Sequence, residues 1–240
     1  MNTQAIIYAG SVLGGLGIVF GVGLAYAAKK FAVEVDPKVP LVREALPGAN
    51  CGACGYPGCD AFSQAVVAGE APVSGCTVGG NPTAKLVAEI MGVTAEEVAR
   101  MVAKVKCMGS KDKCPDRYEY FGYSSCVAAN QLSGGPKGCS YGCMGLGSCV
   151  QVCPFDAIHI NASGLAEVDP EKCTACMKCI KICPKQVISL VPYDQKTIVR
   201  CNNIEIGAHV KKNCAVACIA CRICEKNCPS DAIHVINNLA

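Results

Sequence analysis

The sequence predicts an α+β protein that starts with a transmembrane helix, continues into a small helical domain and ends in modules with short strands. Three observations predict this order. An uncharged, mostly apolar run covers residues 4–28. Behind it, Gly- and Pro-rich loops alternate with segments of helical periodicity. From residue 139 onward, a Cys-Pro pair occurs three times, and alternating apolar residues that are typical of a short strand follow each one.

Residues 4–28 are long enough to cross a bilayer, which takes about 20 apolar residues. Lys29 and Lys30 follow at once, so the positive-inside rule places the C-terminal side in the cytoplasm. A secretory signal is the alternative, because residues 25–27 read Ala-Tyr-Ala, but no positive charge precedes the apolar run. Residues 1–33 are therefore predicted as a retained single-pass anchor in the cell membrane, with the domains that follow it on the cytoplasmic side.

Residues 34–106 are expected to form a small helical domain around a metal centre. One loop rich in Gly and Pro carries three cysteines, and the next loop carries a fourth. These are Cys51, Cys54, Cys59 and Cys76. Four soft thiolates suit a [4Fe–4S] cluster, and a zinc ion would accept the same set.

Helices are expected on both sides of these loops. A short one covers residues 41–46, and another covers residues 61–68. Two more, over residues 83–91 and 94–106, are separated by Gly92. The last helix would begin with a Thr-x-x-Glu capping box. Its apolar residues recur at helical spacing and are expected to pack inside the domain; they are Val98, Met101, Val102 and Val105.

The cysteine spacing of the C-terminal half is the most specific signal. The pattern C-x2-C-x2-C-x3-C-P occurs at Cys173, Cys176, Cys179 and Cys183, and again at Cys218, Cys221, Cys224 and Cys228. It is the bacterial ferredoxin signature for [4Fe–4S] clusters, in which three thiolates bind one cluster and the fourth binds another. The odd total of 21 cysteines disfavours a disulfide framework, and zinc sites do not need the Pro. Residues 139–200 are predicted as a two-cluster bacterial-ferredoxin-like domain and residues 201–240 as a further, incomplete module.

The segments after Cys153, Cys183 and Cys228 share one template. Each continues with Pro, two variable residues, a small or branched apolar residue and Ile, and then alternates polar and apolar residues. A short strand is expected in all three places. His159 and His234 occupy the same polar position and are interpreted as strand residues, not as metal ligands.

The crossover of two-cluster ferredoxins assigns ligands to the modules. The trio Cys173, Cys176 and Cys179 takes Cys153 as its fourth ligand. The trio of the irregular preceding motif, with its spacing C-x3-C-x5-C, takes Cys183 in return. That trio is Cys139, Cys143 and Cys149. The longer loop leaves the choice of this trio open.

The motif at residues 218–228 lacks a distal cysteine for its trio and a trio for Cys228. Residues 231–240 match residues 156–166, after which the chain continues into the next motif. We therefore expect the natural polypeptide to continue past Ala240 into a fourth ferredoxin motif.

Five cysteines remain, three of them in a Gly- and Cys-rich connector at residues 107–138. They are Cys107, Cys114, Cys126, Cys201 and Cys214. Four of the five suffice for one more cluster, or one of them completes the Cys218 site. Cys114 is expected to be the most dispensable, because it stands in a charged, loop-like segment.

Four features together resemble the B subunit of the Rnf complex. They are the apolar anchor, the tandem ferredoxin motifs, the loop Asn-Cys-Gly-Ala-Cys-Gly-Tyr-Pro-Gly-Cys at residues 50–59, and the stretch Gly-Gly-Pro-Lys-Gly-Cys-Ser-Tyr-Gly-Cys at residues 134–143. The resemblance covers essentially the whole chain. It implies a membrane ferredoxin:NAD oxidoreductase that moves sodium ions or protons. In such a complex the B subunit receives electrons from soluble reduced ferredoxin and relays them to neighbouring membrane and flavoprotein subunits.

The expected cofactors are multiple [4Fe–4S] clusters, at least three in number, with no flavin or NAD in this chain and no catalytic acid or base. A net charge of +3 and few aromatic residues do not predict a nucleic-acid partner. Two alternatives are a membrane-tethered polyferredoxin that serves a hydrogenase or another reductase, and a non-redox scaffold with structural metal.

Basic residues crowd the ferredoxin motifs. They are Lys172, Lys178, Lys181, Lys185, Lys211, Lys212, Arg222 and Lys226. They form either an ordinary solvated face or a docking patch that steers an acidic ferredoxin.

Overall fold

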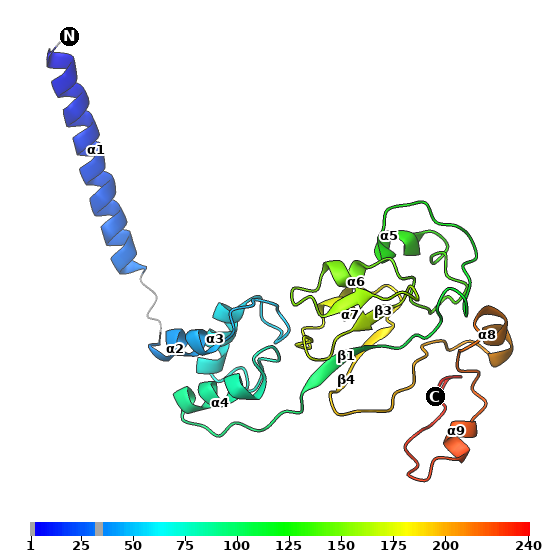
Figure 1. Ribbon diagram of the computed structural model, residues 1–240. Helices are drawn as coiled ribbons and strands as arrows, with labels where there is room; N and C mark the ends of the chain where they lie inside the picture. The colour runs from blue at the N-terminus through cyan, green and yellow to red at the C-terminus, as the bar shows by residue number, and fades with distance from the viewer. Residues whose placement is uncertain (1–2, 32–35) are drawn as a thin grey trace.

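The computed structural model describes residues 3–31 and 36–240, and Figure 1 shows it as a ribbon. Its first element is one long helix, α1 (Thr3–Lys30), as predicted for residues 4–28. Within it, residues 10–30 are apolar and long enough to cross a membrane. Lys29 and Lys30 occupy its last turn, where cations interact favourably with the helix dipole.

Three helices form the small domain that follows: α2 (Lys38–Ala45), α3 (Cys59–Val67) and α4 (Gly80–Met91). They confirm the predicted helices at 41–46, 61–68 and 83–91, with shifted ends. Phe62 of α3 and Val87 of α4 are fully buried against Val42 of α2. The left-handed backbone of Gly92 (φ 73°) ends α4, as is common after a helix.

The helix predicted over residues 94–106 is wrong. Met101–Val105 form strand β1, which pairs antiparallel with β4 (Ile188–Pro192) and places Val105 opposite Ile188. The side chains of Val102 and Val105 are buried, as expected for packing residues, but the sheet buries them. Branched Val side chains favour strands, and this pairing across more than 80 residues is a tertiary effect that helical spacing does not reveal.

The ferredoxin-like unit consists of two small sheets and two short helices (Figure 1). Strand β2 (Ile158–Ile160) pairs antiparallel with β3 (Ala166–Val168), and β4 pairs with β1. The helices α6 (Ser148–Gln151) and α7 (Lys178–Ile182) lie between the cysteines of their motifs. Ile158, Val187, Ile188 and Val105 form one core with several cysteines, so the thiols are held from the hydrophobic side.

Strands therefore form after Cys153 and Cys183 as predicted, with His159 exposed on β2. The strand predicted after Cys228 is wrong, and His234 is not a strand residue. A single bridge between Ile236 and Leu239 closes this segment instead. The strand after Cys153 pairs with β3 and the strand after Cys183 pairs with β1, whereas the described residues supply no partner strand for the segment after Cys228.

The remaining elements are α5 (Cys126–Gln131) in the connector and α8 (Gly207–Asn213) and α9 (Ile223–Lys226) near the C-terminus. In Figure 1, α8 and α9 lie at the end of the molecule opposite to α1. Helix α8 is anchored by Val210, which is completely buried. Helix α9 has no buried residue.

Candidate metal centres

The same backbone turn recurs around three cysteine loops. In each, the second and fourth residues after a cysteine adopt the left-handed conformation, and a short helix follows at once. These residues are Gly145 and Gly147, Ala175 and Met177, and Ala220 and Arg222, with φ of 72° and 78°, 56° and 61°, and 56° and 59°. Non-glycine residues in this region cost on the order of 1–3 kcal/mol and persist where the surroundings enforce them. The turn makes Cys143, Cys173 and Cys218 structurally equivalent.

The first centre lies in the small helical domain. Cys51, Cys54, Cys59 and Cys76 line one cavity, as the sequence predicts. The side chain of Asn50 accepts a hydrogen bond from the Cys59 amide at 2.8 Å, which fixes the loop at the start of α3.

The Gly79 amide donates to the Cys76 sulfur at 3.4 Å. Burial raises the pKa of the Cys76 thiol, and the neighbouring thiols raise it further. Binding of a metal must therefore displace protons from these thiols.

The second centre shows the predicted crossover. Cys153 lines one cavity together with the trio Cys173, Cys176 and Cys179. The amide of Ala103 in β1 donates to the Cys173 sulfur, and the amide of Ala157 donates to the Cys153 sulfur, both at 3.4 Å. Strand β1 thus reaches the centre directly.

The third centre differs from the predicted set. Cys143, Cys149 and Cys183 line one cavity, but its fourth cysteine is Cys126 instead of Cys139. Cys126 begins α5, and its amide donates to the Oγ of Ser148, the first residue of α6, at 2.8 Å. The pKa of Cys149 is raised to about 12, chiefly by burial and in smaller part by the nearby thiols of Cys143 and Cys126.

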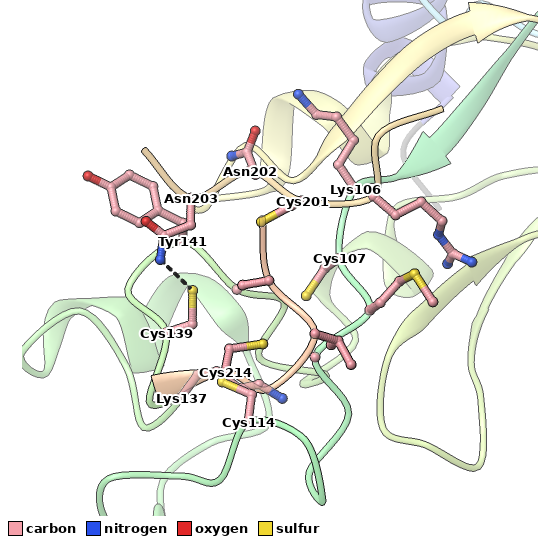
Figure 2. A pocket seen from close by; sticks show the side chains of 16 residues that line it. Lys106, Cys107, Cys114, Lys137, Cys139, Tyr141, Cys201, Asn202, Asn203 and Cys214 are labelled. Atoms are coloured by element: carbon pink, nitrogen blue, oxygen red, sulfur yellow. Dashed lines mark hydrogen bonds between the residues drawn. The ribbon is translucent and has the colours of Figure 1, made fainter. Parts of the chain in front are cut away.

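The fourth centre collects the cysteines that the motifs left over. Five cysteines line one cavity: Cys107, Cys114, Cys139, Cys201 and Cys214. Figure 2 shows four of the thiols turned toward a shared space, with Cys114 beside Cys214. Asn203 donates its side-chain amide to the Cys139 sulfur at 3.3 Å, which is the dashed line in Figure 2.

The third and fourth centres touch, because the amide of Cys143 donates to the Cys107 sulfur at 3.4 Å. A backbone group next to one set of thiols therefore contacts a thiol of the other set directly.

Cys114 was expected to be dispensable because of its charged surroundings in the sequence. Its side chain is instead completely buried and packs with Cys139 and Cys214. Burial raises the pKa of the Cys114 thiol to about 11, and the positive charge of Lys137 opposes that rise. Cys114 therefore forms part of the wall of the fourth centre.

The thiols at these four centres fit an iron–sulfur cluster. All 21 cysteines lie within the described residues and carry free thiols. Among the described residues, no three His, Cys, Asp or Glu side chains lie close enough together to hold a single metal ion, so the thiols of each cavity suit a cluster better than one zinc ion held at about 2.3 Å. Amide groups donate to a sulfur at the first, second and fourth centres, as hydrogen bonds to cluster sulfurs do.

Comparison with protein families gives the same chemistry. A family model for an Fe-S cluster matches residues 46–78, and two models described as 4Fe-4S binding domains match residues 142–159 and 165–188. Over 99% of its length the chain is 52% identical to the B subunit of the Na(+)-translocating ferredoxin:NAD(+) oxidoreductase complex of Acetobacterium woodii, and covers 71% of that protein. The chain belongs to the family of Rnf B subunits.

Two further members of the family match the chain over nearly its whole length. The B subunit of the proton-translocating ferredoxin:NAD(+) oxidoreductase complex of Clostridium ljungdahlii is 45% identical, and the alignment covers 100% of this chain and 84% of that protein. The B subunit of the ion-translocating oxidoreductase complex of Methanosarcina acetivorans is 40% identical, with 99% and 90% covered. The resemblance drawn from the sequence motifs is therefore confirmed.

In this member of the Rnf family, the structure places Cys139 in a different cavity from Cys143 and Cys149, and the backbone gives the reason. When Cys143 is aligned with Cys173, Cys149 aligns with Cys179, and Leu146 stands where the second cysteine, Cys176, belongs. The spacing C-x5-C is thus C-x2-Leu-x2-C, and Cys126 lines the cavity where the regular motif would supply its second cysteine. The five residues between Cys143 and Cys149 were the signal available in the sequence, because the regular motif also has five residues between its first and third cysteines, one of them the second cysteine.

The motif at residues 218–228 has the same backbone turn as the other ferredoxin motifs, but its cysteines are not buried by other segments of the described chain. Cys221 and Cys224 are exposed, and Cys218 and Cys228 are half-buried. The amide of Ala232 donates to the Cys228 sulfur at 3.2 Å, as Ala157 does to Cys153. Hydrogen bonds from this amide and from those of Ser230 and Ile233 lower the pKa of Cys228.

Proposed function

We propose that this chain is the iron–sulfur relay subunit of a membrane-bound, ion-translocating ferredoxin:NAD oxidoreductase. It would accept electrons from soluble reduced ferredoxin and pass them to membrane and flavoprotein subunits of the same complex. The names of its relatives support the reaction, and they name sodium ions in one case and protons in another. The apolar helix α1 supports a single-pass anchor with the remaining chain on the cytoplasmic side.

The observation that carries the proposal is the contiguity of three centres. Cys179 of the second centre is close enough to raise the pKa of Cys149 in the third, and the Cys143 amide contacts Cys107 of the fourth. When bound, a [4Fe–4S] cluster supplies one-electron transfer at potentials within about −700 to +450 mV. The chain's own residues would hold such groups side by side.

The ligand sets that we propose are those of the four cavities: Cys51, Cys54, Cys59 and Cys76; Cys153, Cys173, Cys176 and Cys179; Cys126, Cys143, Cys149 and Cys183; Cys107, Cys139, Cys201 and Cys214. Cys218, Cys221, Cys224 and Cys228 are proposed as ligands that need further cysteines. The chain would therefore carry at least four clusters.

The encounter with an acidic ferredoxin would use exposed lysines of the ferredoxin-like unit, such as Lys172 and Lys181. Lys185 does not belong to that surface. It is half-buried, donates to the Gly134 carbonyl at 2.6 Å and lines the third centre.

The test is anaerobic purification of the intact membrane complex. We expect iron and acid-labile sulfide at four or more clusters per chain, reduced-cluster signals in electron paramagnetic resonance, and ferredoxin-dependent NAD reduction that responds to sodium ions or to the proton gradient. A complex in which this chain contains zinc and no labile sulfide would contradict the proposal. Co-purification with a hydrogenase instead of an NAD-reducing flavoprotein would favour the tethered polyferredoxin.

A further inference from the structure

The fourth centre is the most positively charged of the four. Three basic side chains line it, Lys106, Lys137 and Arg200, and among the described residues that line it there is no carboxylate. The described linings of the first and second centres contain no charged side chain, and that of the third contains only Lys185. The four cavities are therefore built from similar thiols but differ in electrostatics.

Lys137 is the unusual member of this set. Only 2% of its surface is exposed, and within the described part of the chain it forms no ion pair. Figure 2 shows it beside Cys114 and Cys214. Burial of an ammonium group without an anionic partner is unfavourable, so such a group is stabilised by a negative charge placed nearby.

The backbone fixes Lys137 at this position. The Gly138 amide donates to the Pro115 carbonyl at 3.0 Å, and the Arg117 amide donates to the Pro136 carbonyl at 2.6 Å. A Cβ atom at Gly138 would stand 2.5 Å from the Pro115 oxygen, so only glycine allows this approach. Lys137 is thus held at the wall by the residues on both sides of it.

Asn203 acts on the same centre from a different segment of the chain. It is 1% exposed, donates to the Cys139 sulfur at 3.3 Å, and accepts the Glu205 amide through its Oδ1 atom at 2.7 Å. The second contact orients the amide group, whose Nδ2 atom donates to the Cys139 sulfur and, at 3.4 Å, also to the Glu205 carboxylate.

We propose that Lys137 and the Asn203 amide make the fourth centre the one with the highest reduction potential among the four. This inference rests on the proposed function, because it requires a cluster at that centre. One-electron reduction by ferredoxin adds one negative charge to the centre. A buried cation and an N–H donor at sulfur both stabilise the more negative state, which raises the potential. An electron that enters the chain would therefore reside mainly at the fourth centre.

The experiment is a redox titration of the anaerobically purified complex, followed by electron paramagnetic resonance. The variants are Lys137→Gln, Lys137→Arg and Asn203→Asp, with exposed Lys172→Gln as the matched control. Asn203→Asp keeps the Oδ1 acceptor for the Glu205 amide, removes the N–H donor and adds a negative charge, and the last two changes both favour a more negative midpoint. A Cys201→Ser variant identifies which signal belongs to the fourth centre.

We expect the fourth-centre signal to titrate at the highest potential in the unaltered protein. It should shift to a more negative midpoint in Lys137→Gln and Asn203→Asp, and stay in place in Lys137→Arg and Lys172→Gln. If the fourth centre does not assemble in Lys137→Gln, the midpoints of Asn203→Asp and Lys137→Arg provide the test: the first should be more negative and the second unchanged.

Equal midpoints in all variants, or a fourth-centre signal that titrates below the others, would overturn the inference and leave the cluster count intact. If Cys201→Ser kept all of its iron and every signal, there would be no cluster at this centre, and that part of the proposed function would be removed with it.

Discussion

The motifs at residues 173–183 and 218–228 have the same spacing and nearly the same backbone, but different surroundings. Ala175 and Ala220 both have φ of 56°, and a short helix follows each loop. Yet Cys176 is 9% exposed, whereas Cys221 and Cys224 are exposed. The spacing thus encodes the loop itself, and the enclosure comes from other segments.

The segment that makes the difference is β1. It pairs with β4, which follows Cys183, and its Ala103 amide reaches Cys173. No described strand pairs with the residues after Cys228. A cluster loop becomes a closed centre only where a second piece of chain covers it.

The largest effect should follow from disrupting that cover. Val105→Asp places a carboxylate in the core shared by the second and third centres, where Val105 is 4% exposed. Burial of an unpaired charge should lower stability by about 3 kcal/mol or more. Thermal loss of the cluster absorbance in the visible range should occur at a clearly lower temperature than in the unaltered protein.

The matched control is Val98→Asp, because Val98 is 50% exposed in the segment before β1. It should change stability by no more than about 0.5 kcal/mol. Equal effects of the two substitutions would show that β1 is not needed to close these centres.

A second prediction concerns the 139–153 motif, in which Leu146 replaces a cysteine. Cys126→Ser should remove about four iron atoms per chain, the content of one [4Fe–4S] cluster. Adding Leu146→Cys in the same chain should restore them, because it recreates the regular spacing. Iron and labile sulfide analysis measures both steps; retention of all iron in Cys126→Ser would contradict the ligand set.

The substitutions at Val105 and Cys126 concern contacts that the sequence does not predict, whereas other features follow from it. The short strands after Cys153 and Cys183, the helices α2 to α4 and the grouping of Cys51 to Cys76 follow from local patterns. The entry of Cys126 into the third centre and the burial of Cys114 do not, because both depend on contacts of the connector with distant residues. The pairing of β1 with β4 could not be predicted for the same reason.

A third prediction compares the thiols of the two motifs in the metal-free chain. Cys221 and Cys224 should react with an alkylating agent at least about tenfold faster than Cys176, because reactivity requires access. The lowered pKa of Cys228 keeps its thiolate present at lower pH, so its alkylation should persist as the pH falls below the range in which an unfolded cysteine peptide reacts. Peptide mass spectrometry after timed alkylation measures these rates.

Uniform alkylation of Cys176, Cys221 and Cys224 would mean that the metal-free chain does not keep the enclosure that separates the two motifs. If alkylation of Cys228 followed the same pH dependence as an unfolded cysteine peptide, that would contradict the role of the amides that donate to Cys228.

The smallest effect should come from the loop backbone. Ala175→Gly removes the cost of a left-handed alanine and should stabilise the protein by up to about 1 kcal/mol. The reference is Ala157→Gly, at a buried position without positive φ, which should destabilise. Thermal unfolding followed by visible absorbance distinguishes the two signs; a loss of stability in both would show that strain in the loop is not significant.

The reciprocal placement of Cys153 and Cys183 has a consequence for damage by oxygen. Each cysteine stands at the end of one motif but serves the centre of the other. Oxidative destruction of one site would release its fourth cysteine, which belongs to the loop of the other motif. That loop would then loosen and expose the second site to oxygen as well. The pair should therefore fail, and be repaired, as one unit.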